Sequence, residues 1–104
     1  MTDKFHTKAE RKRYLDYIKF SPIWREKCKR IRERDVVCKR CSSDERLHVH
    51  HKHYRSFECE LDNDLVLLCK VCHDKLHKLH NKLRKKWGLE YVTDMFVKKK
   101  ERYL

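Results

Sequence analysis

The stretch Asp64-Leu65-Val66-Leu67-Leu68-Cys69-Lys70-Val71-Cys72-His73 decides what this chain can fold into. A short apolar run at 65–68 leads into two cysteines, Cys69 and Cys72, that stand three positions apart. From His73 onward, apolar residues recur at the spacing of one helix face. The pattern therefore predicts a short buried segment, a cysteine pair and a helix in direct succession.

A second cysteine pair, Cys38 and Cys41, has the same internal spacing, and 27 residues separate the two pairs. The N-terminus has no apolar segment of the kind that directs secretion, so we expect thiols in a reducing compartment rather than disulfides. Two such pairs supply the four thiolates of a structural zinc site, although the usual separation is shorter, about 15–20 residues. The sequence predicts one Zn²⁺ bound by Cys38, Cys41, Cys69 and Cys72.

The cysteines and histidines also allow other metal assignments, which their spacing disfavours. A finger with two cysteines and two histidines would leave only eight residues between Cys41 and His50, and His50 to His53 would have to form a tight bend. Cys72 and His73 are neighbours at a helix start, where side chains diverge by roughly 100°, so one ion would struggle to use both. We therefore expect two sites that share one helix.

Helices are expected to dominate, because one glycine and one proline leave few tight turns in 104 residues. Helical spacing of apolar residues predicts helices over 8–19 and 22–34, and alternation predicts a strand over 47–50. We expect Gly88 to end the helix that follows the second cysteine pair, and Thr93 to cap a last helix in the tail.

The length supports one modest core, so we expect a single helix-rich α+β domain over 1–104. Its parts are two N-terminal helices (1–34), the segment that carries the metal ligands (35–87) and a helical tail (88–104). The N-terminal helices are expected to pack against the metal-binding segment.

The charge of the chain indicates the class of its partner. Lys and Arg number 28 against 16 Asp and Glu, which gives a formal net charge of +12. This excess favours a polyanion, because basic side chains near phosphates release condensed counterions. A self-repelling surface without a partner is the alternative. No apolar run approaches the ~18 residues of a membrane span, so we expect no membrane and a location in the cytoplasm.

Four histidines occupy positions suited to a second metal site. His73 and His77 are one helical turn apart, which places both imidazoles on one face, although such a pair alone is more often a coincidence of surface residues. In a strand, His50 and His51 point to opposite faces, so one can bind a metal while the other faces a substrate. A Lewis-acidic metal and a neutral imidazole are the minimum apparatus for hydrolysing a phosphodiester.

These residues together carry a family likeness. Val49-His50-His51, followed by Asp64-Leu65-Val66-x-Leu68-Cys69-x-x-Cys72-His73-x-x-x-His77, resembles the motif of HNH endonucleases of the ββα-metal, or His-Me finger, superfamily. Ser21-x-x-Trp24 and Arg34-Asp35-x-x-Cys38-x-x-Cys41 are similar to small phage and prophage HNH proteins. The likeness covers about residues 14–80 and implies a ββα-metal core held by the four-cysteine zinc site.

The resemblance also implies roles for individual residues. His51 matches the general base, and His50 and His73 match ligands of a catalytic divalent ion. His77 matches the third ligand of those HNH nucleases that use three histidines, whereas other branches use two. Asp64 stands at the central position of the motif, where its carboxylate can either tie the loop to the backbone or approach the metal.

The implied activity is metal-dependent hydrolysis of DNA, by nicking or with weak sequence preference, with structural Zn²⁺ and catalytic Mg²⁺, Mn²⁺ or a similar ion. Double-stranded DNA is the expected partner, in a bacterial or phage-infected cell, with a homodimer or a phage protein as the further partner considered. Glu60 is expected to be loop scaffold. The alternative is a zinc-bound nucleic-acid-binding module without catalysis. Candidates to line the DNA backbone path are Arg40, Lys52, Arg55, Lys70, Lys75, Lys78 and Lys82.

Overall fold

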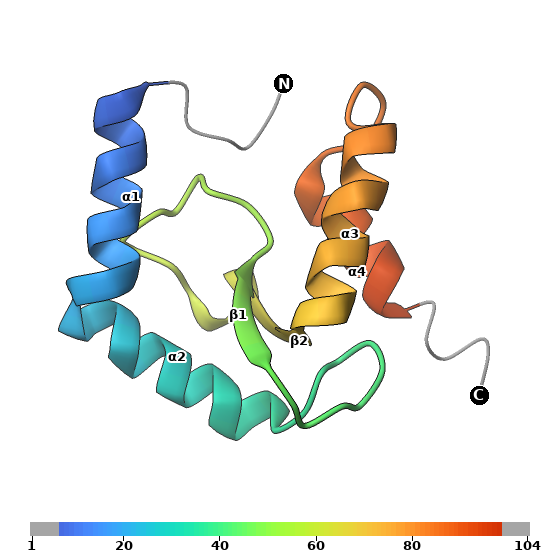
Figure 1. Ribbon diagram of the computed structural model, residues 1–104, viewed down its shortest axis with the longest axis horizontal. Coiled ribbons are helices and arrows are strands. Elements are labelled where there is room, and N and C mark those ends of the chain that lie inside the picture. Colours follow the sequence, from blue (N-terminus) through green and yellow to red (C-terminus); the bar gives the residue numbers. More distant parts are fainter. Residues whose placement is uncertain (1–6, 99–104) are drawn as a thin grey trace.

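A β-hairpin at the centre of the molecule is flanked by one pair of helices on each side (Figure 1). The computed structural model describes residues 7–98. Its elements are, in chain order, α1 (Lys8–Phe20), α2 (Pro22–Asp35), β1 (Leu47–His51), the short 3₁₀ helix η1 (Asp62–Asp64), β2 (Leu65–Cys69), α3 (Lys70–Leu83) and α4 (Leu89–Lys98). Over this range the chain is an α+β fold with four α-helices and a two-stranded antiparallel sheet. The helix-rich α+β class agrees with the sequence prediction.

The alternation of side chains along β2 divides the core into two clusters. Leu65 and Leu67 face α1 and α2, where they pack with Tyr17, Trp24 and Ile31. The intervening β2 residues face α3 and α4. The cluster on that side consists of Cys38, Val66, Leu68, Cys69, Cys72, Leu76, Val92 and Phe96. A strand buried on both faces reads as a continuous apolar run, which is what 65–68 shows.

Side-chain caps fix where the helices begin. The Thr7 hydroxyl accepts from the N–H of Glu10 at 3.0 Å, and the Glu10 carboxylate accepts from the N–H of Thr7 at 3.1 Å, so α1 starts with a capping box. Ser21 caps α2. α3 is capped by a thiol, because the Cys69 sulfur accepts from the N–H of Cys72 at 3.4 Å. The residue that starts α3 therefore also belongs to the predicted zinc site.

The outer edge of β2 is closed by the end of α2. The Arg34 guanidinium donates to the carbonyl oxygen of Leu65 at 2.7 Å, and the Asp35 carboxylate accepts from the N–H of Leu67 at 3.0 Å. The N–H of Lys39 donates to the Leu67 carbonyl at 3.0 Å. An unpaired strand edge invites pairing with another chain. These bonds both orient α2 and protect the sheet.

The helix that follows the second cysteine pair is shorter than the sequence suggests. α3 ends at Leu83, the last of its residues that packs against the core, and the exposed basic residues 84–86 follow in a turn. The N–H of Trp87 donates to the Leu83 carbonyl at 2.8 Å within this turn. The expectation that Gly88 ends α3 is therefore wrong. Its carbonyl instead accepts from the N–H of Val92 at 3.1 Å and begins α4.

Thr93 lies inside α4 rather than at its start. The helix begins at Leu89, so the expected cap at Thr93 is wrong. Thr93 is fully buried, next to Val92, because this face of α4 packs toward α3 and the sheet. Residues 99–104 of the expected tail helix lie outside the described range. Among residues 7–98, no helix has both the length and the apolar character that a membrane span requires.

Candidate metal centres

The four cysteines of the two pairs converge beside the start of α3. The four Sγ atoms all lie within 4.8 Å of one another; they belong to Cys38, Cys41, Cys69 and Cys72. The Sγ atoms of Cys41 and Cys69 are 3.6 Å apart. Two thiolates on a tetrahedral zinc ion, with Zn–S bonds of about 2.3 Å, would be separated by about 3.8 Å. The donor set and its spacing therefore fit one Zn²⁺ ion.

Backbone donors and mutual repulsion set the charge of these thiols. Burial alone would raise the pKa of Cys38, but backbone N–H groups, including those of Arg40 and Cys41 at 3.4 and 3.5 Å, bring that pKa down to about 7. Burial and the neighbouring thiols raise the pKa of Cys72 far above its usual range. Four thiolates this close repel one another, so they ionise together only around a cation.

A second cluster, the three-histidine site, lies between β1 and α3. His50 projects from β1, and His73 and His77 project from one face of α3, with one ligand nitrogen of each within 4.8 Å of the others. The Nε2 atoms of His73 and His77 are 3.2 Å apart. Two imidazole nitrogens bound to one tetrahedral zinc ion at about 2.0–2.1 Å would be separated by about 3.3 Å. The three nitrogens therefore fit a single divalent ion.

Two histidines of this site, His50 and His73, are held in the neutral form that a metal needs. Burial holds the pKa of His50 well below its usual range, and the neighbouring His73 and His77 lower it further. Burial and the neighbouring His77 lower the pKa of His73 to about 4. At neutral pH both rings therefore keep a lone pair for a divalent ion rather than a proton.

Two neighbouring residues of α3 belong to different clusters. Cys72 belongs to the cysteine cluster and the next residue, His73, belongs to the three-histidine site. Side chains of adjacent helical residues diverge by about 100°, so neither residue can serve the other site. As expected, two clusters of potential metal ligands meet on one helix.

A fourth histidine, His48, flanks the three-histidine site on the solvent side. It stands two residues before His50 in β1 and so projects from the same face of the sheet. Its ring centroid is 5.9 Å from that of His73, and its side chain is exposed. Sequence reasoning missed this residue, although the alternation of His48 and His50 along one strand was the available signal.

His51 points to the opposite face of the hairpin, as strand alternation predicts, and it is enclosed there. Its ring stacks on Trp24, with centroids 4.7 Å apart and planes at 8°, and on Tyr54, with centroids 5.2 Å apart. The residue is 2% exposed. Its Nε2 lies 2.7 Å from a carboxylate oxygen of Glu60. When Nε2 carries the proton and donates it to this carboxylate, the lone pair of neutral His51 is on Nδ1.

Glu60 is the centre of a buried polar network. The sequence led us to expect only a loop scaffold role for this residue. Its second carboxylate oxygen accepts from the Lys27 ammonium at 2.8 Å and from the Tyr17 hydroxyl at 2.8 Å. The side chain has no exposed surface. Burial alone would raise its pKa, but hydrogen bonds from His51, Lys27 and Tyr17 outweigh burial and lower the pKa to about 2. Glu60 is therefore a buried carboxylate that fixes the orientation of His51.

The signal for this network was present in α2. Lys27 lies three residues after Trp24 and four before Ile31, so it occupies the apolar stripe of that helix. A lysine in a buried stripe requires a carboxylate partner, because an unpaired buried charge is strongly destabilising. The sequence could thus have predicted a buried acid facing α2, although not which of the acids in the loop supplies it.

Asp64 ties the loop between the strands together. Its carboxylate accepts from the N–H of Leu61 at 2.9 Å and from the Ser56 hydroxyl at 2.7 Å, and it lies 3.0 Å from Nε2 of His53. Burial would raise the pKa of Asp64, but these hydrogen bonds lower it. Asp64 is not part of the three-histidine cluster. Of its two expected roles, the structure places it in the loop-tying one.

The seven basic residues expected along a DNA path divide into two groups. Lys52, Arg55 and Lys70 each form an ion pair with a nearby acid, at 3.0, 2.7 and 3.0 Å respectively. The Arg40 guanidinium lies over the ring of Phe96, 4.6 Å from its centroid. The remaining three are exposed on α3 and form no ion pair within the described residues: Lys75, Lys78 and Lys82.

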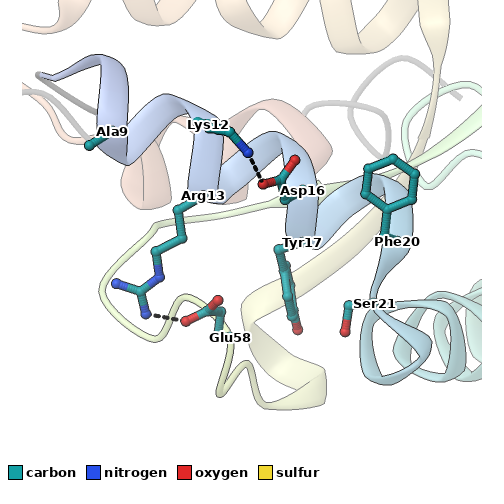
Figure 2. A pocket seen from close by; sticks show the side chains of 8 residues that line it. All are labelled: Ala9, Lys12, Arg13, Asp16, Tyr17, Phe20, Ser21 and Glu58. Atoms are coloured by element: carbon teal, nitrogen blue, oxygen red, sulfur yellow. Dashed lines mark hydrogen bonds and ion pairs between the residues drawn. The ribbon is translucent and has the colours of Figure 1, made fainter.

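A pocket between α1 and the loop that follows β1 involves neither cluster (Figure 2). Ion pairs between Lys12 and Asp16 and between Arg13 and Glu58 lie along it. Its full lining is Ala9, Lys12, Arg13, Asp16, Tyr17, Phe20, Ser21 and Glu58. Two lining residues connect it to the Glu60 network: the Tyr17 hydroxyl donates to Glu60, and the Glu58 carbonyl accepts from the Lys27 ammonium at 3.4 Å.

We expect Cys72→Ser to abolish folding or sharply lower the melting temperature, because zinc bound to four thiolates supplies folding free energy directly. Metal analysis of the wild type should give about one tightly held zinc per chain. Cys59→Ser is the matched control, because that thiol is exposed and lies outside the cluster, and it should melt like the wild type. A folded, stable, zinc-free wild type would contradict the assignment.

Glu60→Gln should lower the free energy of unfolding at pH 7 by roughly 3–5 kcal/mol, because it leaves the Lys27 ammonium buried without its counter-charge. Glu58→Gln, in the same loop but partly exposed, should cost at most about 1 kcal/mol. Since folding lowers the Glu60 pKa from 4.5 to about 2, its ionic contribution is complete above pH 4.5 and is lost toward pH 2. Equal effects of the two substitutions in chemical denaturation would argue against the network.

Comparison with protein-family models, with curated proteins and with solved structures finds no match for this chain. A functional conclusion therefore rests on the residues themselves. Three features of the described region carry it: a four-cysteine cluster, a three-histidine site on the same helix, and a histidine held by a buried carboxylate.

Proposed function

We propose that this chain is a metal-dependent endonuclease that hydrolyses phosphodiester bonds in DNA, with the ββα-metal arrangement that the HNH-like motif implies. The observation that carries the proposal is the three-histidine site. A hairpin strand presents His50 to His73 and His77 at the start of the helix that follows the hairpin. A module that only binds nucleic acid needs the cysteine cluster for stability, but it has no use for a second set of ligands.

The two clusters suit different metals and different tasks. Four thiolates are soft ligands that select zinc, and they leave no open position, so the cysteine cluster supports a structural role. Three neutral imidazoles leave positions on an ion open to a substrate oxygen. A divalent ion held by His50, His73 and His77 would act as a Lewis acid toward a phosphate oxygen.

The general base assigned to His51 is supported by the Glu60 contact. When the Nε2–H group of His51 donates to the Glu60 carboxylate, Nδ1 is the nitrogen that can take a proton from water. The ring is only 2% exposed and is covered by Tyr54 from the loop between the strands. The role therefore requires the loop to move when substrate binds. His48, which is exposed beside His73, needs no such movement and is the competing candidate for the base.

DNA binding is supported by the basic surface of α3. Lys75, Lys78 and Lys82 are exposed, and no acid within residues 7–98 pairs with them. The net charge of +12 provides further attraction along the whole chain. Contacts to phosphates carry no sequence information. Weak sequence preference or nicking is therefore the activity that we propose, in the cytoplasm of a bacterial or phage-infected cell.

The zinc-loaded wild type should nick supercoiled plasmid when Mg²⁺ or Mn²⁺ is supplied. His51→Ala should keep its zinc and its divalent-metal affinity while losing roughly 10²–10⁴-fold in rate, the usual contribution of a positioned base. Because it removes a buried ring, its melting temperature should also fall. His73→Ala should instead weaken metal binding, so activity should partly return at high metal concentration. His48→Ala should remain active.

The variants also separate the two candidate bases. If the nicking rate falls in His48→Ala and stays at the wild-type level in His51→Ala, the general base is His48. If the wild type nicks no substrate with any of several divalent metals while still binding DNA, the chain is a zinc-bound nucleic-acid-binding module instead.

Affinity for duplex DNA should fall steeply as salt rises, because each neutralised phosphate releases condensed counterions. Replacing Lys75, Lys78 and Lys82 together by Gln should make the slope of log K against log salt shallower by about 3, close to one per lost phosphate contact. Replacing three paired cations outside the expected DNA path, Lys12, Arg13 and Arg30, by Gln is the control and should change the slope less. Fluorescence anisotropy over a salt series measures both, and an affinity that does not depend on salt would contradict a phosphate-binding role.

A further inference from the structure

Thr93 of α4 makes the polar contact that holds the most deeply buried member of the three-histidine site. Its Oγ1 lies 3.1 Å from Nε2 of His50, and both residues are buried, with Thr93 at 0% and His50 at 2% exposure. The ring of His50 in turn contacts both other members, with centroid distances of 5.1 Å to His73 and 5.4 Å to His77. α4 therefore reaches the site through one hydroxyl group.

A neutral imidazole can offer a metal only the nitrogen that carries no proton. Which nitrogen that is depends on the hydrogen bond made by the other one. In metal sites, the ligating histidine commonly donates its second N–H to a fixed acceptor, which sets both the tautomer and the ring orientation. For His50, the atom within hydrogen-bond distance of Nε2 is Oγ1 of Thr93.

We propose that Thr93 is a positioning residue for the three-histidine site, whose hydroxyl oxygen accepts the Nε2–H of His50 and so directs the Nδ1 lone pair to the metal ion. This inference rests on the proposed metal-binding role of the site. It makes α4 a working part of that site, although the sequence motif ends before this helix begins.

The surroundings of Thr93 favour this direction of the hydrogen bond. Val92 and Phe96, its neighbours in α4, are buried apolar residues, so a hydroxyl at this position would be costly to bury without a partner. A threonine inside a helix commonly donates its own proton to the carbonyl one turn earlier, which leaves oxygen lone pairs free to accept from a ring N–H. An ordinary core position would be filled by valine, which has the same shape.

The test uses the full zinc-loaded chain, with Co²⁺ as the probe for the three-histidine site. Visible absorption follows the titration, and thiolate-to-cobalt charge-transfer bands show whether cobalt has instead entered the cysteine cluster. Thr93→Val removes only the hydroxyl and should weaken Co²⁺ binding by roughly 10–100-fold. Thr93→Ser retains the hydroxyl and should bind within a few-fold of the wild type. Val92→Ala, an adjacent buried residue without a polar group, controls for loss of packing and should leave the affinity unchanged.

A second readout is independent of affinity and of activity. Long-range ¹H–¹⁵N correlation spectra of the zinc-loaded wild type, without cobalt, should show His50 as the Nε2–H tautomer, and Thr93→Val should populate the other tautomer. An Nδ1–H tautomer in the wild type would overturn the proposal, and so would a Thr93→Val variant with wild-type affinity for cobalt. If the wild type binds no second metal, the three-histidine site itself is wrong. If it binds cobalt in a Thr93-dependent way but nicks no DNA, the assignment of Thr93 stands and only the nuclease proposal falls.

Discussion

The pairing register of the two strands is the constraint on which the rest of this molecule depends. His50 lies opposite Val66 and His51 lies opposite Leu65. Because side chains alternate along a strand, a slip of one residue would move every side chain of the slipped strand to the wrong face. The register places His50 against α3 and His51 against α2, and it places Leu65 and Val66 in the two separate core clusters. Bonds from Arg34 and Asp35 to the outer edge of β2 reinforce this single arrangement.

The buried polar groups on the two faces of the hairpin differ in charge. On the α3 side, burial and neighbouring histidines lower the pKa values of His50 and His73, so these two rings carry no charge of their own at neutral pH. On the α2 side the buried groups are charged, and the Glu60 carboxylate is matched by the Lys27 ammonium. A buried charge is tolerated only with a partner in good geometry. The three rings of the histidine site could accommodate a cation. The Glu60–Lys27 pair is already neutralised within the chain, and its carboxylate orients His51.

Sequence patterns predicted those features that depend on local spacing. The helices α1 and α2, the cysteine cluster and the assignment of Cys72 and His73 to different sites all follow from the helical period or from pair spacing. Features that depend on distant segments were missed. Glu60 and Thr93 are each separated by many positions from the histidine they contact, and nothing in their immediate neighbours marks them out. The end of α3 was misplaced because packing against the core, and not the glycine downstream, decides where that helix stops.

The thiol cap at the start of α3 links the two clusters through a single sulfur atom. Cys69 is a member of the cysteine cluster, and its sulfur also caps the helix on which His73 and His77 stand. Loss of this thiol would therefore disturb the cysteine cluster and the start of α3 at the same time. The placement of the two α3 histidines thus depends on a residue that is not itself a histidine-site member.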